Sequence, residues 1–218
     1  MANDTKINFW IPSLPPAREY KKENLREIER FSQFIYTVGE YPILRSPSIA
    51  VIEQEMTSNE MKQKYAYLKK CMREFRRITK GKGRGIAGVQ VGIPERFFLL
   101  YQPGIKKPFT IIINPVVTKK SIELLSYPES CMSANSLIAD VIRPAWIEFE
   151  YFNEWGQKQY WQLKATTKQG KMYNRIVQHE IDHLDGIINI DYVPASSLIF
   201  EMGTEYYGKA RFRKISKK

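Results

Sequence analysis

The sequence of 218 residues contains very little cysteine or histidine, with two residues of each. Cys71 and Cys131 are too few for the disulfide framework that holds small secreted domains together, so a reducing compartment is favoured. No apolar run approaches the roughly 20 residues that a membrane-spanning helix needs. The first ten residues also lack the basic and then apolar layout of a secretory signal. We therefore expect a cytoplasmic protein without a membrane segment.

The two histidines are close together in the sequence. His179 and His183 lie four residues apart, and Glu180 directly follows the first of them. On an α-helix this spacing brings both imidazoles onto one side, where they can bind a single divalent metal ion. A glutamate at this position can take a proton from water activated by that metal. A solvated helix with two unrelated histidines would produce this arrangement only by chance, so the pattern predicts a metal-dependent hydrolase.

A catalytic metal site of this kind needs a third protein ligand and an open position for water. Metzincin proteases use a third histidine, but Asn189 occupies the corresponding place here. Gluzincin proteases use a glutamate from a later helix, for which Glu201 or Glu205 could serve. The third possibility is Cys131, which lies among turn-forming residues and offers a thiolate, an excellent ligand for a borderline metal.

Three motifs in a fixed order resemble those of the peptide deformylase family. The family's GxGxAAxQ corresponds to residues 83–90, with Gly88 at the second alanine. EGCxS corresponds to residues 129–133, with Ser130 in place of glycine. QHExxHLxG matches residues 178–186 without a departure. Any one motif would be weak evidence, whereas three in order are strong.

Weaker similarities extend the resemblance over residues 41–193, which we interpret as the catalytic domain. Residues 1–40 form an N-terminal extension, an arm followed by a helix predicted over 17–36. Six basic and six acidic residues balance in this extension, which argues against an organellar targeting segment. We expect this helix to pack on the catalytic domain, with partner binding as the alternative. Residues 194–218 form a C-terminal extension that ends in a basic tail.

The hydrophobic patterns predict an α+β fold. Helices are expected over 59–80 and 171–184, and strands over 96–101, 110–113, 146–152 and 158–163. Gly186 should end the second helix. The glycine-rich run 80–85 lacks the Gly-Lys-Ser/Thr of a phosphate-binding loop, so nucleotide binding is not expected. The fold predicted is a set of small antiparallel or mixed β-sheets around a central metal-binding helix that carries HExxH.

The resemblance implies a specific site. Its metal ligands are Cys131, His179 and His183, and the expected ion is Fe(II), although zinc, nickel or cobalt would suit the same ligands. Glu180 is expected to act as base and then as acid. The resemblance assigns the oxyanion contacts to the Gln90 side-chain amide and the backbone N–H of Met132. It also implies that Gly85, Ile86 and Arg143 contact the substrate.

The activity implied is hydrolysis of the N-formyl group from the formyl-methionine of nascent polypeptides, with release of formate. Ser130 fits in place of glycine if the backbone is extended there, and Gly88 should loosen the packing only modestly. Two alternatives remain open at this point: a gluzincin-type metalloprotease that uses Glu201 or Glu205, and an inactive ribosome-associated homologue.

The basic tail accounts for part of the net charge of +11, since residues 209–218 hold six basic residues and no acidic ones. One interpretation is a solvated terminus. The other is electrostatic docking on ribosomal RNA, close to emerging formylated chains. No recognised DNA- or RNA-reading module is found, so sequence-specific nucleic-acid binding is not expected.

Overall fold

The computed structural model describes residues 26, 29–200 and 210–215. The predicted N-terminal arm and most of the predicted helix 17–36 lie outside these residues. Within the described part, residues 29–32 are helical. Phe31 and Ile35 at the end of this segment are buried, and the Phe31 ring lies 5.1 Å from that of Phe75, centroid to centroid. The end of the N-terminal extension therefore packs on the rest of the protein.

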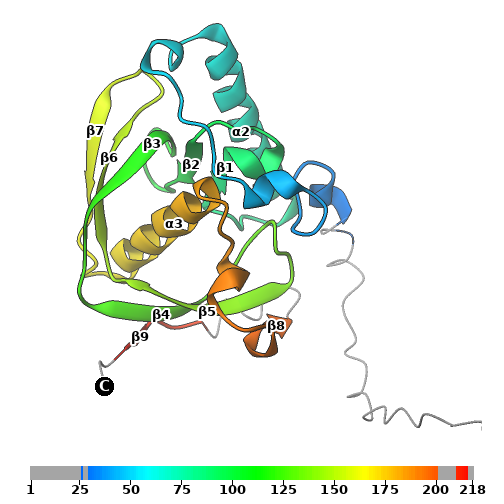
Figure 1. Ribbon diagram of the computed structural model, residues 1–218, viewed down its shortest axis with the longest axis vertical. Helices are drawn as coiled ribbons and strands as arrows, with labels where there is room; N and C mark the ends of the chain where they lie inside the picture. The colour runs from blue at the N-terminus through cyan, green and yellow to red at the C-terminus, as the bar shows by residue number, and fades with distance from the viewer. Residues whose placement is uncertain (1–25, 27–28, 201–209, 216–218) are drawn as a thin grey trace, which may run out of the picture.

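The strands form two antiparallel sheets (Figure 1). The first has the order β1-β2-β3-β6-β7, with β1 Gly85–Ala87, β2 Phe97–Tyr101, β3 Phe109–Lys120, β6 Ile147–Phe152 and β7 Lys158–Gln162. The second has the order β8-β5-β4-β9, with β4 Leu124–Ser130, β5 Leu137–Pro144, β8 Ile199–Phe200 and β9 Arg213–Lys214. The α+β prediction is confirmed.

Two long helices, α2 (Asn59–Ile78) and α3 (Lys168–Leu184), accompany the sheets. Each begins at a side-chain cap, because Ser58 accepts a hydrogen bond from the Met61 N–H and Thr167 accepts one from the Gly170 N–H. Neither these helices nor any other in the described ranges is long and apolar enough to cross a membrane. The described residues also contain short 3₁₀ helices: η1 Pro42–Arg45, η2 Glu53–Glu55, η3 Gly88–Val91, η4 Asn189–Tyr192 and η5 Ala195–Ser197.

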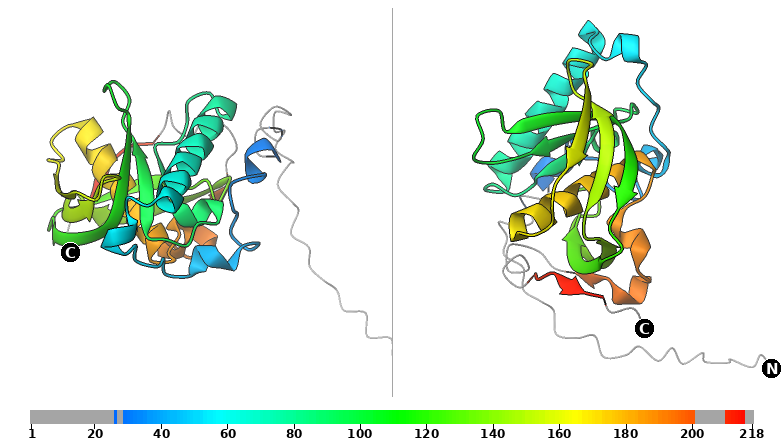
Figure 2. Two further views of the ribbon diagram at one scale, coloured as in Figure 1. Left: turned by 90° about the horizontal axis from the view of Figure 1, so that it is seen from above. Right: turned by 90° about the vertical axis from the view of Figure 1, so that its left-hand side faces the viewer.

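The first sheet is buried on both sides at β2. Along this strand Phe97 and Leu99 join the apolar cluster of α2, whereas Phe98 and Leu100 join the cluster of α3. This explains why β2 is a continuous apolar run instead of an alternating one. Figure 2 shows the sheet between the two helices. Helix α3, which carries both histidines, is thereby held against β1 and β2.

Candidate metal centre

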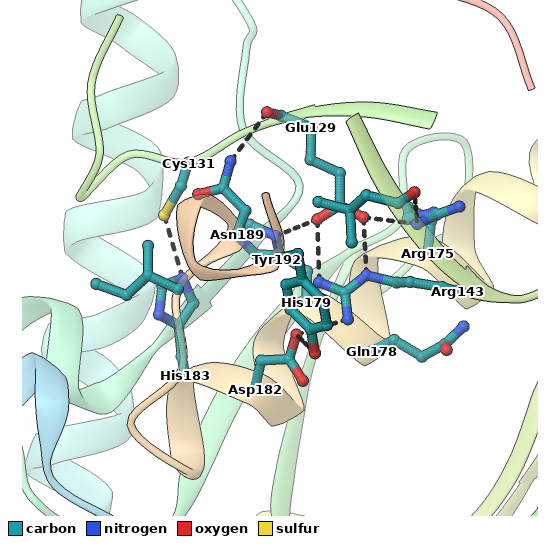
Figure 3. A network of polar contacts seen from close by, with 12 residues as sticks. Glu129, Cys131, Arg143, Arg175, Gln178, His179, Asp182, His183, Asn189 and Tyr192 are labelled. Carbon is teal, nitrogen blue, oxygen red and sulfur yellow. Dashed lines mark hydrogen bonds and ion pairs between the residues drawn. The ribbon is translucent and has the colours of Figure 1, made fainter. Parts of the chain in front are cut away.

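Three side chains from two elements converge at the C-terminal end of α3. His179 and His183 lie one helical turn apart, and Cys131 directly follows β4. The ligand atoms of these three residues all lie within 4.8 Å of one another. The Cys131 Sγ is 3.2 Å from the His183 Nε2 (Figure 3). Around a tetrahedral ion, such sulfur and nitrogen ligands would lie roughly 3.6 Å apart, so the donor set fits a single divalent metal.

The cysteine is held as an anion. Burial alone would raise the pKa of Cys131, but the charge of His183 and hydrogen bonds from His179 and His183 lower this pKa well below its ordinary value. The Ser133 N–H lies 3.4 Å from the sulfur and adds a donor. A thiolate is the form of cysteine that binds metal. The site therefore favours the protonation state that a ligand needs.

Glu129 fixes the orientation of the His179 ring. Its Oε2 lies 2.9 Å from the His179 Nδ1, which leaves Nε2 directed towards the centre (Figure 3). Arg143 and Arg175 bind the same buried carboxylate, with Arg143 Nε at 2.8 Å and Arg175 Nη1 at 2.9 Å from its Oε1. Burial would raise the pKa of Glu129, but the Arg143 charge and the His179 hydrogen bond hold this pKa far below its usual range. The histidine ring is thus oriented by a carboxylate that stays ionised.

Arg143 lies within this network, although we expected it to contact the substrate. Its side chain is 4% exposed and also donates to Asp182 at 2.5 Å. The guanidinium lies 4.9 Å from the centroid of the Tyr192 ring, whose hydroxyl also bonds Asp182. The substrate role of Arg143 stays a prediction, whereas these contacts favour a positioning role. Sequence reasoning did not identify Arg175, because an arginine in a helix is typical of a solvated side.

Glu180 is buried beside the same centre. Burial raises the pKa of its carboxyl to about 7. Its Oε2 has no hydrogen-bond partner among the described residues. A Cβ added to Gly85 would lie only 2.3 Å from the Glu180 Oε1, so the glycine and the carboxylate are in direct contact. Ile86, the next residue of β1, is fully buried in the cluster of α2.

The remaining predicted side chain, Gln90, lies in η3 with its amide beside the cysteine. Its Oε1 accepts a hydrogen bond of 2.9 Å from the Ala87 N–H. Its Nε2 donates to the Ser133 Oγ at 3.1 Å and lies 3.6 Å from the Cys131 Sγ. Met132 is half-buried next to this group. The structure therefore brings Gln90, Met132 and the three ligand residues together at one place.

The two departures from the motifs have local explanations. Ser130 is the last residue of β4, opposite Ile138, and its φ is not positive, so an L side chain fits there. At Gly88 a Cβ would lie 3.0 Å from the Ile93 carbonyl oxygen, tighter than an ordinary contact. Glycine at position 88 therefore suits this particular backbone.

The other candidate ligands do not join the cluster in the described part of the chain. Glu201 and Glu205 of the gluzincin alternative lie outside the described residues. Cys71 is buried in α2, where burial raises the pKa of its thiol, and it is not part of the three-residue group. A closed structural site would need four protein ligands, and the described cysteines and histidines supply only three at this place.

The fold and the converging donors define a metal-binding α+β protein. A family model described as polypeptide deformylase matches residues 33–197, and the chain belongs to this family. A peptide deformylase of Agrobacterium fabrum is 33% identical over 135 residues, which are 61% of this chain and 75% of the relative. One of Rhizobium meliloti is 38% identical over 113 residues, 51% of this chain and 62% of the relative. The match thus spans less than two thirds of the Rhizobium protein.

Solved structures agree in fold. A probable peptide deformylase from Synechococcus phage S-SSM7 has a TM-score of 0.58 at 29% identity, and the match covers 73% of this chain and 98% of that one. A peptide deformylase from Synechococcus elongatus, solved in complex with actinonin, has a TM-score of 0.58 at 26% identity, covering 73% and 78%.

Proposed function

We propose that this protein is a peptide deformylase, which hydrolyses the N-formyl group of formyl-methionyl chains and releases formate. The observation that carries the proposal is the convergence of Cys131, His179 and His183 beside the buried Glu180, in a chain of the polypeptide deformylase family. The family match gives no support to a gluzincin protease or an inactive homologue.

Cys131, His179 and His183 would hold one divalent ion, with Fe(II) as the expected metal and zinc, nickel or cobalt as substitutes. One thiolate and two imidazoles suit these borderline metals and would not suit calcium or magnesium, which prefer oxygen ligands. When bound, such an ion supplies Lewis acidity to water and to the formyl group. Glu129 keeps the His179 ring in the orientation that presents Nε2 to the ion.

The open edge of β1 offers a place for an extended peptide. β1 is the edge strand of the first sheet. The hydrogen bond from the Tyr101 N–H to the Arg84 carbonyl shows that the backbone groups of Arg84 point towards β2. Because this pairing alternates along antiparallel strands, the N–H and C=O of Gly85 point away from β2. A formyl-peptide can therefore add to β1 as a strand, with its backbone bonded to Gly85.

This placement brings the formyl group next to Glu180, because the Glu180 carboxylate lies against Gly85. Glu180 takes a proton from the attacking water and delivers it to the departing amine. A carboxyl with a pKa raised to about 7 by burial is suited to both transfers near neutral pH. The Gln90 amide and the Met132 N–H would stabilise the developing negative charge on the formyl oxygen.

Formate release under anaerobic conditions tests this proposal. The protein, reconstituted with Fe(II), Ni(II) or Zn(II), is incubated with formyl-Met-Ala-Ser, and formate, free amine and bound metal are measured in the same sample. We expect formate and amine in equal amounts and about one metal per chain. A protein that binds one metal per chain but releases no formate with any of the three would contradict the proposal.

A further inference from the structure

Arg84 is a cation in the middle of the first motif, between the two glycines at positions 83 and 85. Its side chain is exposed, and its guanidinium carbon lies 5.9 Å from the centroid of the Tyr173 ring on α3. In the part of the chain that the structure describes, no carboxylate is bonded to it. This differs from several other arginines around the centre, such as Arg96, Arg143 and Arg175, which each bind a carboxylate.

The loop before Arg84 is held firmly. Arg76 donates to the carbonyl of Gly81 at 2.6 Å and to that of Gly83 at 2.7 Å. The Arg76 guanidinium also lies 3.9 Å from the centroid of the Tyr101 ring. The backbone of Arg84 itself is bonded to Tyr101. The backbone of Arg84 is therefore already ordered, so less conformational entropy is lost when its side chain binds a ligand.

A peptide bound along the open edge of β1 can extend in only one direction. By the same alternation, the N–H of Ala87 also points away from β2, but it already donates to the Gln90 Oε1 at 2.9 Å. The Ala87 end is thus closed by Gln90. A peptide whose formyl group lies beside Glu180 at Gly85 must therefore continue towards Arg84.

The sequence that leads to Arg84 is rich in basic residues, of which Arg77 is paired with Glu74. Residues 76–84 contain five basic residues and no acidic one: Arg76, Arg77, Lys80, Lys82 and Arg84. An extended chain advances about 3.3 Å per residue, so Arg84 comes alongside the residues that follow formyl-methionine. Without a carboxylate of its own among the described residues, Arg84 can bind one from the peptide.

We propose that Arg84 is a specificity-determining residue that binds an acidic side chain at the second or third position of the formyl-peptide. This assignment rests on the deformylase activity proposed above. The substrate class is therefore a formyl-methionyl chain with aspartate or glutamate directly after the methionine. A basic residue at the same position would meet the like charge of Arg84 and is disfavoured.

The test uses matched peptides: formyl-Met-Glu-Ser, formyl-Met-Gln-Ser and formyl-Met-Lys-Ser, and the same three residues placed third. We expect the kcat/KM of the metal-loaded protein to be higher for glutamate than for glutamine by up to about fivefold, the upper end of what one exposed ion pair contributes, and lower for lysine. Arg84→Gln should remove the preference, and Arg84→Glu should reverse it in favour of lysine. Lys62→Gln, which neutralises an exposed cation of α2, is the control and should leave the preference unchanged.

Reversal in the charge-swapped variant is a result that a merely structural arginine would not give. Turnover of all peptides at equal rates, or a glutamate preference that survives Arg84→Gln, would overturn the role of Arg84 and leave the deformylase activity in place. A metal-loaded wild-type protein that releases no formate from any of the peptides would instead overturn the activity itself, and the assignment with it.

Discussion

The α-carbon of Gly85 lies directly against the carboxylate of Glu180. A side chain at position 85 would place its Cβ 2.3 Å from the Glu180 Oε1, closer than any real contact. The glycine is therefore required by the position of the carboxylate and not by its own backbone angle, because its φ is not in the left-handed region. This contact joins the first motif, on β1, to the third motif, on α3.

Gly85→Ala should displace Glu180 and lower kcat by at least tenfold, since a misplaced acid–base group loses part of its usual 10²- to 10⁴-fold effect. Bound metal should stay at the wild-type level because no ligand is touched. Lys62→Ala, at an exposed position of α2, is the control. That variant should keep its turnover. Equal kcat in both variants would contradict the contact as the reason for Gly85.

Cys131→Ser should lose most of the bound metal, because a neutral hydroxyl is a much poorer ligand than a thiolate. Metal content after gel filtration measures this directly, and Cys71→Ser is the matched control that should retain its metal. Full occupancy in the Cys131 variant would refute the three-ligand assignment and bring Glu201 or Glu205 back as the third ligand.

Glu129→Gln should weaken both the fold and the metal site. It leaves Arg143 and Arg175 buried without their shared carboxylate, a loss of about 3–5 kcal/mol in the free energy of unfolding. Metal affinity, measured by competition with a chelator, should fall roughly 10- to 100-fold because the His179 ring loses its charged partner.

Glu150→Gln provides the comparison for that variant. Glu150 pairs with Lys158, but both side chains are more than 40% exposed. Its removal should change the unfolding free energy by less than about 1 kcal/mol and leave metal affinity unaltered. If the two variants were equally stable, Glu129 would not be the carboxylate that holds this network together.

The basic tail gives a further prediction. Its described part is folded onto β4: Arg213 pairs with Asp140 and Lys214 with Glu123, so at least two of the six basic residues are already matched by acids. If the tail docks on ribosomal RNA, a chain ending at Gly208 should bind ribosomes more weakly and with a shallower salt dependence than the full chain. The truncation also removes β9 from β4, so turnover of a free formyl-peptide and the free energy of unfolding are measured beside ribosome affinity, to separate docking from stability. Equal ribosome affinity at several salt concentrations would leave the tail without a docking role.

The sequence predicted most elements of the fold because their patterns are regular. The helix expected over 59–80 is α2, and the four expected strands correspond to β2, β3, β6 and β7. The metal helix begins three residues earlier than expected, at Lys168, because Thr167 caps it. The strands β4 and β5 on either side of Cys131 were missed, since Pro128 and the polar residues around it are typical of a turn.

The site was predicted only where its residues stand in motifs. Cys131, His179 and His183 were recognisable from local patterns, and the structure brings them together. The network around Glu129 was not recognisable, because Arg143 and Arg175 reach it from sequence separations of 14 and 46 residues. Contacts between residues so far apart in the sequence depend on how β5 and α3 pack. The hydrophobic periodicity of a single sequence does not predict that packing.

The most direct test of the account is the Glu180→Ala variant, with metal content and turnover measured on the same preparation. Glu180 binds no metal in this account but moves the proton. The variant should therefore keep about one metal per chain and its folded structure, while kcat for a formyl-peptide falls at least a hundredfold. Near-normal formate release by a fully metal-loaded Glu180→Ala protein would contradict the assignment, and another group would have to carry the proton.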